Sequence, residues 1–295
     1  MRLIMLLSVN SRRPYAELAE KLNLSVNAVH KRIQLLLETG VIRRFTAKVS
    51  ILGAKAFVVY VSGTSFLNSF HDLPDKLKAQ GSIYWLALGG GKYVCVGAYL
   101  RDLIELDSLV SYVKKEVGIP DPVVGILSVL PSQVPSISNL SDLTLCDLDY
   151  RIIRALKDDS RKAISDVADE VAISAKTVRR RLSRIMQKGL AEFSVEWYPD
   201  KSNDILTIVD VHLKPDADKN VVYEIWKKYP PNILIFWTYA NLPNIATYVV
   251  WTNSMNELQT LREKLEKEES LSSVMPNILY TGFIFDTWRD QLVKK

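Results

Sequence analysis

SRRPYAELAEKLNLSVNAVHKRIQLLLETG, at residues 11–40, returns 149 positions later as SRKAISDVADEVAISAKTVRRRLSRIMQKG at residues 160–189. The two segments align without a gap, and most residue classes match: Leu18, Leu22, Leu24, Ile33 and Leu36 correspond to Val167, Val171, Ile173, Leu182 and Ile185. Identical residues at matched positions are Ser11/Ser160, Arg12/Arg161, Ala19/Ala168, Ser25/Ser174, Val29/Val178, Arg32/Arg181 and Gly40/Gly189. The chain therefore carries one structural unit twice, about half its length apart.

The repeated unit has the pattern of a helix-turn-helix. In the second copy, apolar residues recur at helical spacing in three short segments, and Asp147 or Asp149 is placed to cap the first of them. Ser174 is placed to cap the third helix, and Gly189 follows it where a left-handed residue is favoured. Three helices with a tight turn between the last two are typical of a helix-turn-helix.

The third helix of each copy presents a polar face opposite its buried stripe. In a helix-turn-helix this helix lies in the major groove, where Asn and Gln suit adenine and Arg or Lys suits guanine. The predicted DNA-binding residues are Ser25, Asn27, His30, Lys31 and Gln34 in the first copy, and Ser174, Lys176, Thr177, Arg179, Arg180 and Arg184 in the second. Arg32 and Arg181 lie beside the stripe, so we expect them to brace the fold or hold a phosphate.

Positive charge is concentrated in the repeated units. Residues 1–48 hold nine Lys or Arg and three Asp or Glu, and residues 147–194 hold eleven and eight; the rest of the chain is slightly acidic, although the whole carries +5. Such segregation suits a basic head that contacts phosphates and a body that does not. The alternative is a solvated basic surface with no partner, which the presence of two capped copies disfavours.

A segment with a different pattern of apolar residues follows each helical unit. In the first, strands are predicted at 56–61, 82–88, 93–99 and 123–129. A helix is predicted at 67–80, where Pro74 limits how early it can start, and another is built on Leu103, Leu106, Leu109, Val110 and Val113. In the second, strands are predicted at 206–213, 233–239, 245–252 and 278–285, with helices at 221–228 and 257–268. Both orders are βαββαβ, the ferredoxin-like plan.

These patterns predict an α+β chain of 295 residues with two helix-turn-helix heads alternating with two βαββαβ bodies. Head 1 is residues 1–48, body 1 is 49–130, head 2 is 144–196 and body 2 is 204–286. A Pro- and Ser-rich linker is expected at 131–143. No apolar run is long enough for a membrane span, so we expect a cytoplasmic protein.

The order of head and body resembles the Lrp/AsnC family of transcriptional regulators. The likeness is carried by Asp147–Ile153, Asp159–Arg161 and Ser174–Arg181 in the second copy, and by Leu24–Ser25, Arg32–Ile33, Gly40–Phe45 and Leu52–Gly53 in the first. The resemblance implies winged-helix heads that bind double-stranded DNA. It also implies a homo-oligomer formed through the bodies and, in many members, a small effector such as an amino acid.

The chain departs from the family pattern in three places. The family usually has an acidic residue after the Gly-x-Tyr of the central hairpin, whereas Gly91-Lys92-Tyr93 is followed by Val94 and the second hairpin turns through residues 241–244. Effector-binding residues are therefore left unassigned. Head 1 also lacks the acidic residues that open head 2, and the tandem arrangement differs from the usual single unit.

Two other functions remain open beside a sequence-specific regulator. Siroheme decarboxylases resemble paired head-plus-body units, but they use histidines near the central hairpin, and His30, His71 and His212 all lie elsewhere. We therefore expect no catalytic residues. An architectural, DNA-coating protein is the other alternative. The two cysteines, Cys95 and Cys146, have no metal-binding pattern, so neither a metal nor a cofactor is expected.

Overall fold

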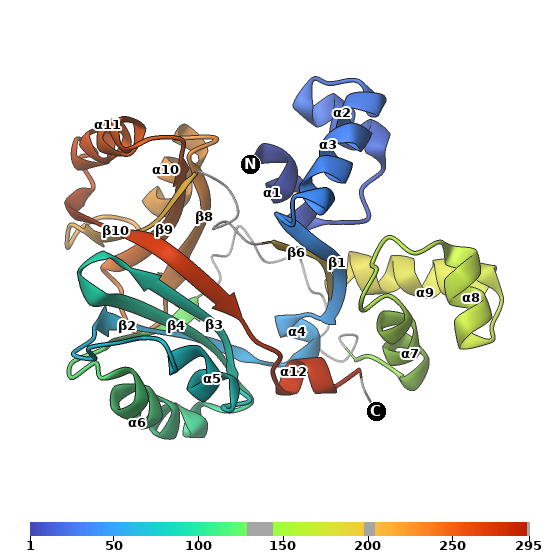
Figure 1. Cartoon of the computed structure of the whole chain (residues 1–295), viewed down its shortest axis with the longest axis horizontal. Helices are drawn as coiled ribbons and strands as arrows, with labels where there is room; N and C mark the ends of the chain where they lie inside the picture. The colour runs from blue at the N-terminus through green and yellow to red at the C-terminus, as the bar shows by residue number, and fades with distance from the viewer. Residues whose placement is uncertain (129–143, 198–203, 294–295) are drawn as a thin grey trace. The chain divides into compact units, whose positions relative to one another are not determined.

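The computed structural model describes residues 1–128, 144–197 and 204–293, which form two compact units (Figure 1). The head unit gathers the described residues within 1–56, 135–202 and 288–295, and the body unit gathers those within 57–134 and 203–287. The predicted linker at 131–143 lies outside the described residues. Within the described ranges, no helix combines the length and the apolar character that a bilayer crossing needs.

The head unit contains both helix-turn-helix motifs. Head 1 consists of α1 (Arg2–Val9), α2 (Tyr15–Leu22), α3 (Val26–Glu38), β1 (Ile42–Val49) and the short α4 (Ile51–Ala54). Head 2 consists of α7 (Asp147–Ala155), α8 (Ile164–Val171), α9 (Ala175–Gln187) and β6 (Ala191–Trp197), and the chain returns to this unit in α12 (Trp288–Gln291). The strand that follows each motif pairs with its counterpart, because β1 and β6 form a two-stranded antiparallel sheet.

Each head completes its hydrophobic core with the strand of the other head. Val195 of β6 is buried in the core of head 1, with partly buried Trp197 packed beside it. In return, Ala47 and Val49 of β1 are fully buried in the core of head 2. Burial of apolar area is the main favourable term in folding, so neither core is complete without the other head.

The body unit repeats the βαββαβ order twice. Body 1 runs through β2 (Phe57–Thr64), α5 (Leu73–Lys78), β3 (Ile83–Gly89), the turn η1 (Gly90–Lys92), β4 (Tyr93–Leu100), η2 (Leu103–Glu105), α6 (Leu106–Val117) and β5 (Val123–Ser128). Body 2 runs through β7 (Ile205–Leu213), α10 (Val221–Lys228), β8 (Ile233–Tyr239), β9 (Ile245–Thr252), α11 (Met255–Glu266) and β10 (Leu271–Ile284). The predicted fold class is confirmed.

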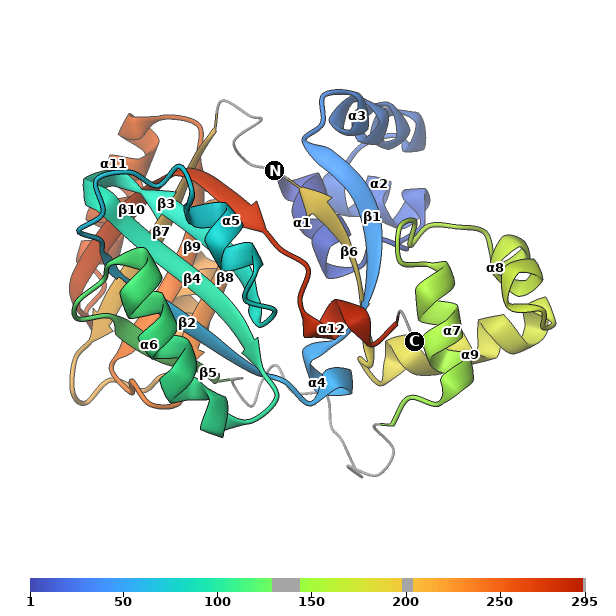
Figure 2. The same ribbon diagram turned by 60° about the horizontal axis from the view of Figure 1, so that its bottom comes forward.

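The two bodies close into one barrel, in the strand order β10-β3-β4-β2-β5-β8-β9-β7 (Figure 2). β10 makes one seam by pairing with β7 along its first half and with β3 along its second half. β5 and β8 make the other seam at Leu127↔Tyr239 and Ser128↔Thr238. Closure leaves no strand of the barrel with a free edge. The two bodies of one chain therefore pair with each other.

Two predicted elements differ from the structure. The helix expected within 67–80 is only α5, because Pro74 suits the first turn of a helix and Ser65 and Ser69 hold the preceding segment in turns. The last strand was expected at 278–285, but β10 begins at Leu271. Its first half pairs with β7, and this long-range pairing overrides the turn-like composition of Ser272 and Ser273.

The seams enclose aromatic and polar side chains that the two bodies share. Tyr60 of body 1 stacks on Trp237 of body 2 with ring centroids 4.2 Å apart. The carboxylate of Asp210 accepts hydrogen bonds from Thr247 Oγ1 (2.7 Å) and Asn277 Nδ2 (3.2 Å). Desolvation by burial raises the pKa of Asp210, although the hydrogen bond from Thr247 opposes this rise.

The raised pKa of Asp210 predicts a pH-dependent stability. A carboxyl group with a higher pKa in the folded state stabilises the fold below its unfolded pKa, and this contribution is lost as pH rises through the folded pKa. Asp210→Asn should therefore melt at a higher temperature than the unmodified protein at neutral pH, and the difference should shrink as pH falls towards 4. Thermal unfolding followed by circular dichroism across this pH range measures both effects. The exposed Asp216→Asn is the matched control, and a difference that grows on acidification would contradict the prediction.

Candidate nucleic-acid interface

The helices α3 and α9 are built alike at both ends. The Ser25 side chain accepts a hydrogen bond from the amide of Ala28 (3.1 Å), and that of Ser174 accepts one from the amide of Thr177 (3.2 Å). Gly40 and Gly189 follow the helices in the left-handed conformation, with φ of 71° and 60°. The cap predicted at Ser174 and the end predicted at Gly189 are thus present, and head 1 has the same features at Ser25 and Gly40.

The polar faces of α3 and α9 are free of the core. Val29 and Ile33 bury one side of α3, and Val178, Leu182 and Ile185 bury one side of α9. The side chains predicted to contact DNA are exposed at Ser25, Asn27, His30, Lys31, Gln34, Ser174, Lys176, Arg179 and Arg180, and half-buried at Thr177 and Arg184. The structure thus places all the predicted residues on two helices that belong to one compact unit.

Several of these residues have a structural task within their own head. Ser25 and Ser174 cap their helices, and the Thr177 hydroxyl lies 2.9 Å from that of Ser174. The His30 ring packs edge-on against Tyr15, with centroids 5.5 Å apart. These contacts orient the first turns of α3 and α9, which are the turns that meet base edges in a helix-turn-helix.

Arg184, which is predicted to contact DNA, has intramolecular partners in the structure. The carboxylate of Asp149, which is fully buried, lies 2.9 Å from Arg184 Nη1 and 3.5 Å from Arg181 Nη1. Arg184 Nη2 also donates to the carbonyl of Thr144 (2.8 Å). A buried carboxylate needs such partners, and Arg184 and Arg181 supply them. We name Asp149, Arg181 and Arg184 the Asp149 clamp.

The sequence predicts separate roles for the members of the clamp, and not an ion pair between them. Asp149 was expected only as a helix cap, and it does accept a hydrogen bond from the amide of Cys146 (3.0 Å). Arg181 was expected to brace the head or hold a phosphate, and its contact with Asp149 is a bracing contact. At the matched position in head 1, Arg32 is exposed, and within the described residues it has no hydrogen-bond or ion-pair partner.

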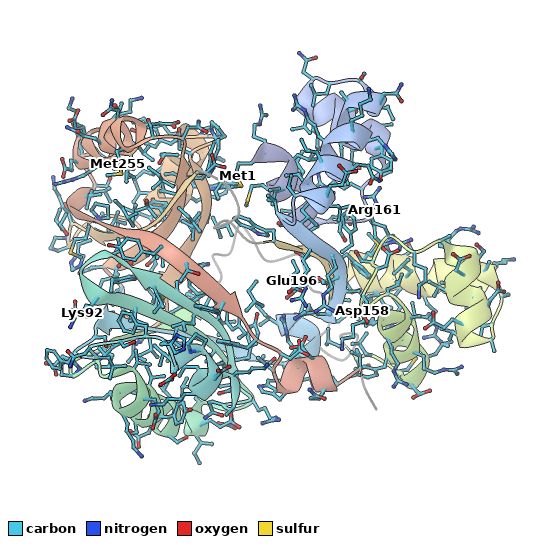
Figure 3. All side chains as sticks on the ribbon, viewed as in Figure 1. Met1, Lys92, Asp158, Arg161, Glu196 and Met255 are labelled. Carbon is cyan, nitrogen blue, oxygen red and sulfur yellow. The ribbon has the colours of Figure 1, made fainter. Side chains whose placement is uncertain are left out.

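The heads meet through the first residues of the repeat, a role that sequence reasoning missed. The hydroxyls of Ser11 and Ser160 are both fully buried and lie 2.5 Å apart. Arg12 donates to the carbonyls of Ser160 and Lys162, and Arg161 donates to those of Ser11 and Arg13. Figure 3 shows Arg161 at this junction. The exchange is two-fold symmetric, because each residue of one copy contacts the matched segment of the other.

The two arginines of the junction carry an electrostatic cost, which their hydrogen bonds to backbone carbonyls and an aromatic contact offset. Burial, and then the nearby positive charge of Arg161, lower the pKa of Arg12. The Arg161 guanidinium lies 4.5 Å from the centre of the Tyr15 ring, which stabilises a cation through its π face. The Ser-Arg pair of each copy thus contacts the other head. This shared contact accounts for the identity of these residues in both copies.

Known proteins match both the helical units and the longer repeat. The AsnC-type helix-turn-helix domain matches residues 1–37 and 146–186. An HTH-type transcriptional regulator of Pyrococcus furiosus is 30% identical over 135 residues, which are 44% of this chain and 91% of the relative. The HTH-type transcriptional regulator LrpA of Pyrococcus horikoshii is 28% identical over 108 residues, which are 36% of this chain and 77% of the relative.

A solved structure matches the tandem arrangement as a whole. The siroheme decarboxylase NirDL has a TM-score of 0.61 and 13% identity, over 99% of this chain and 97% of the other. At that identity the likeness shows the fold alone. The two regulators, by contrast, are covered to 91% and 77% of their length by less than half of this chain. With two helix-turn-helix segments and two βαββαβ bodies, the chain belongs to the Lrp/AsnC family of transcriptional regulators, in a tandem form.

Proposed function

We propose that this regulator binds double-stranded DNA through both heads of one chain, and that the two heads recognise unlike half-sites. The observation that carries the proposal is the pairing of two similar helices with different exposed residues in one compact unit. Asn27 is matched by Lys176, His30 by Arg179, Lys31 by Arg180 and Gln34 by Ser183. A two-fold unit with unlike reading helices asks for an asymmetric site.

The exposed chemistry differs in kind between the heads. Asn27 and Gln34 on α3 carry amides, which pair with the N6 and N7 groups of adenine. Lys176, Arg179 and Arg180 on α9 carry positive charges, which suit guanine O6 and N7 or backbone phosphates. Head 2 would then supply more of the charge-dependent affinity, and head 1 a different base preference.

Phosphate contacts are proposed from the residues that stay unpaired. Arg32 on α3 is exposed and free among the described residues, so we assign it to the DNA backbone. Arg184, which is part of the Asp149 clamp, is removed from the set of direct contacts.

The bodies hold the two halves of one chain together through the barrel, and further association of chains through the bodies is part of the proposal. No effector is assigned.

The decarboxylase fold provides a second candidate function. Its supporting observation is the match of both head-plus-body units to NirDL. The central hairpins at residues 89–93 and 239–245 contain no histidine, and His212 lies on β7. Anaerobic titration with siroheme, followed by absorbance, separates the candidates: a regulator shows no specific spectral shift, whereas a stoichiometric shift with loss of carboxyl groups would establish the enzyme.

Selection of binding sites from random DNA tests the proposal directly. The expected consensus has two different half-sites, with centres separated by about one helical turn, roughly 34–36 Å, or a multiple of it. Enrichment of a symmetric consensus would mean that only one kind of head reads sequence. If no sequence is enriched and binding depends strongly on salt, the protein is an architectural, DNA-coating protein.

Arg180→Ala should weaken binding to the selected site by about 1–3 kcal/mol if this side chain reads a guanine. Its melting temperature should be unchanged, because the side chain is exposed and outside the clamp. Fluorescence anisotropy at fixed salt measures the affinity. Arg262→Ala, which removes one positive charge from α11 of body 2, is the matched control and should bind normally. Equal affinities for the two variants would remove Arg180 from the interface.

Arg184→Ala should act mainly on stability. It leaves Asp149 buried with Arg181 as its remaining cation, so we expect a loss of about 1–3 kcal/mol in the free energy of unfolding. Adding Asp149→Asn should recover part of this loss, because the uncompensated charge is then absent. A variant with normal melting and weakened DNA binding would return Arg184 to the set of direct contacts.

A further inference from the structure

The β1–β6 ribbon has a two-fold centre at the facing pair Thr46 and Ser194. Around this centre each residue of β1 has a counterpart at the same place on β6. Arg44 corresponds to Glu192, and Lys48 corresponds to Glu196. Head 1 has one residue more than head 2 between the end of its third helix and this centre. A β-bulge between Ile42 and Arg44 accommodates the extra residue. The ribbon is therefore symmetric in backbone and asymmetric in charge.

Both strands are apolar on the face of the ribbon that packs into the head cores. Phe45, Ala47 and Val49 alternate along β1, and Phe193, Val195 and Trp197 occupy the corresponding places on β6. All six are apolar, and they pack into the two head cores. Burial of this face favours pairing, but a second copy of either strand would present the same kind of surface.

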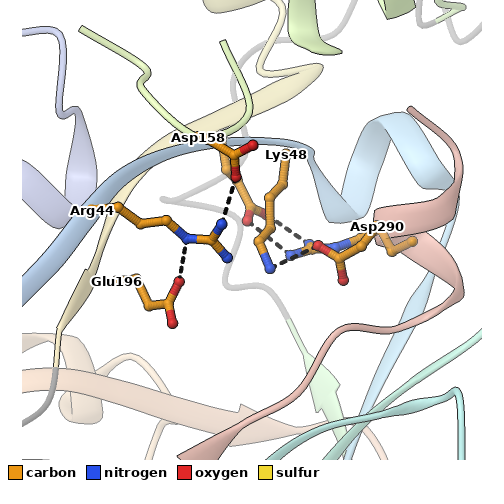
Figure 4. Close-up of polar contacts among 7 residues, drawn as sticks. Arg44, Lys48, Asp158, Glu196 and Asp290 are labelled. Atoms are coloured by element: carbon orange, nitrogen blue, oxygen red, sulfur yellow. Dashed lines mark hydrogen bonds and ion pairs between the residues drawn. The ribbon is translucent and has the colours of Figure 1, made fainter. Parts of the chain in front are cut away.

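The opposite face carries basic side chains on β1 and acidic side chains on β6. At one end, Arg44 faces Glu196 in the register, and its Nε lies 2.6 Å from Glu196 Oε2. Arg43 also reaches Glu196 (3.2 Å), and Arg44 Nη1 reaches Asp158 (2.5 Å). Figure 4 shows Arg44 between the two carboxylates. The Glu196 side chain is only 11% exposed, so its charge is weakly screened by solvent.

At the other end, Lys48 faces Glu192 in the register, and α12 joins them through two further charges. Lys48 Nζ lies 2.7 Å from Asp290 Oδ1, and Arg289 makes two contacts with the Glu192 carboxylate, at 3.1 and 3.2 Å. Figure 4 shows Lys48 against Asp290 at this end. Arg289 and Asp290 are both buried to 4% exposure, so at this end basic and acidic groups alternate around a buried pair.

A ribbon made of two copies of one strand would lose this complementarity. In the same register, two β1 strands would set Arg44 opposite Lys48 at both ends, and two β6 strands would set Glu192 opposite Glu196 at both ends. Like charges directly opposite each other destabilise a strand pair, whereas opposite charges stabilise it. Specific pairing often depends on such a repulsive element as well as on attraction.

We infer that the charged face of the ribbon makes each head select the other kind of head and reject a second copy of itself. β1 fits a partner strand that is apolar on one face and acidic at both ends. β6 fits a partner strand that is apolar on one face and basic at both ends. Every DNA-binding unit then contains one head of each kind. This consequence rests on the proposed function, but the pairing itself is measured without DNA.

Full-length charge-reversal variants test the inference. Glu192→Lys/Glu196→Lys makes both strands basic, and Arg44→Glu/Lys48→Glu makes both strands acidic. Hydrogen–deuterium exchange of peptides from β1 and β6 reports the ribbon directly. Each double variant should lose protection in both strands, while the barrel strands stay protected. Arg262→Glu, on the surface of α11, is the control and should leave the ribbon protected.

The combination of all four substitutions in one chain is the decisive variant. It restores opposite charges across the ribbon, although Asp290 and Arg289 then face like charges, so it should be better protected than either double variant. Refolding the two double variants together should also yield a two-chain species by native mass spectrometry, which neither forms alone. Protection of the fourfold variant no better than that of the doubles, or doubles as protected as the unmodified protein, would overturn the inference. If the variants show the expected exchange pattern but the unmodified protein does not select a DNA sequence, only the proposed function is contradicted.

Discussion

The antiparallel pairing of β1 with β6 is the constraint on which the head unit depends. Each strand closes the hydrophobic core of the opposite head, so neither helix-turn-helix is a finished domain by itself. The Ser11–Ser160 contact and the exchanged arginines add a second attachment at the starts of α2 and α8. Two attachments fix both the separation and the rotation of the reading helices, which is what a pair of DNA-binding heads requires.

The bodies show the same logic in a different architecture. A single βαββαβ sheet would leave two edges open, and open edges invite pairing with other chains. In this chain β10 of body 2 pairs with β3 of body 1, and β5 of body 1 pairs with β8 of body 2, so barrel closure leaves no open edge. The tandem arrangement thereby supplies within one chain the partner that a single unit would need from a second molecule.

Local features of the fold could be predicted from the sequence, whereas pairings between distant segments could not. The caps at Ser25 and Ser174 and the strand Ile233–Tyr239 follow from residue type and spacing, and the structure has them. The β1–β6 pairing depends on which distant edge is available, and periodicity within a strand carries no such information. The extension of β10 back to Leu271 was missed for the same reason.

The candidate site followed the same division. The exposed face of α9 could be predicted from its helical phase, but the partner of Arg184 could not, because Asp149 lies 35 residues away on another helix. The identical Ser-Arg pairs were noticed as a sign of duplication. Their role as the contact between heads emerges only when both copies are seen together.

The central claim is that the paired heads of one chain form the DNA-binding unit. A disulfide across the centre of the ribbon tests it most directly, with Thr46→Cys/Ser194→Cys in a Cys146→Ser background, since Cys146 is exposed and Cys95 is buried. The account predicts that oxidation cross-links the two cysteines within one chain. It also predicts that the oxidised protein binds its selected DNA with the affinity and half-site preference of the reduced protein. Cross-links between chains, or loss of DNA binding on oxidation that reduction restores, would contradict the account.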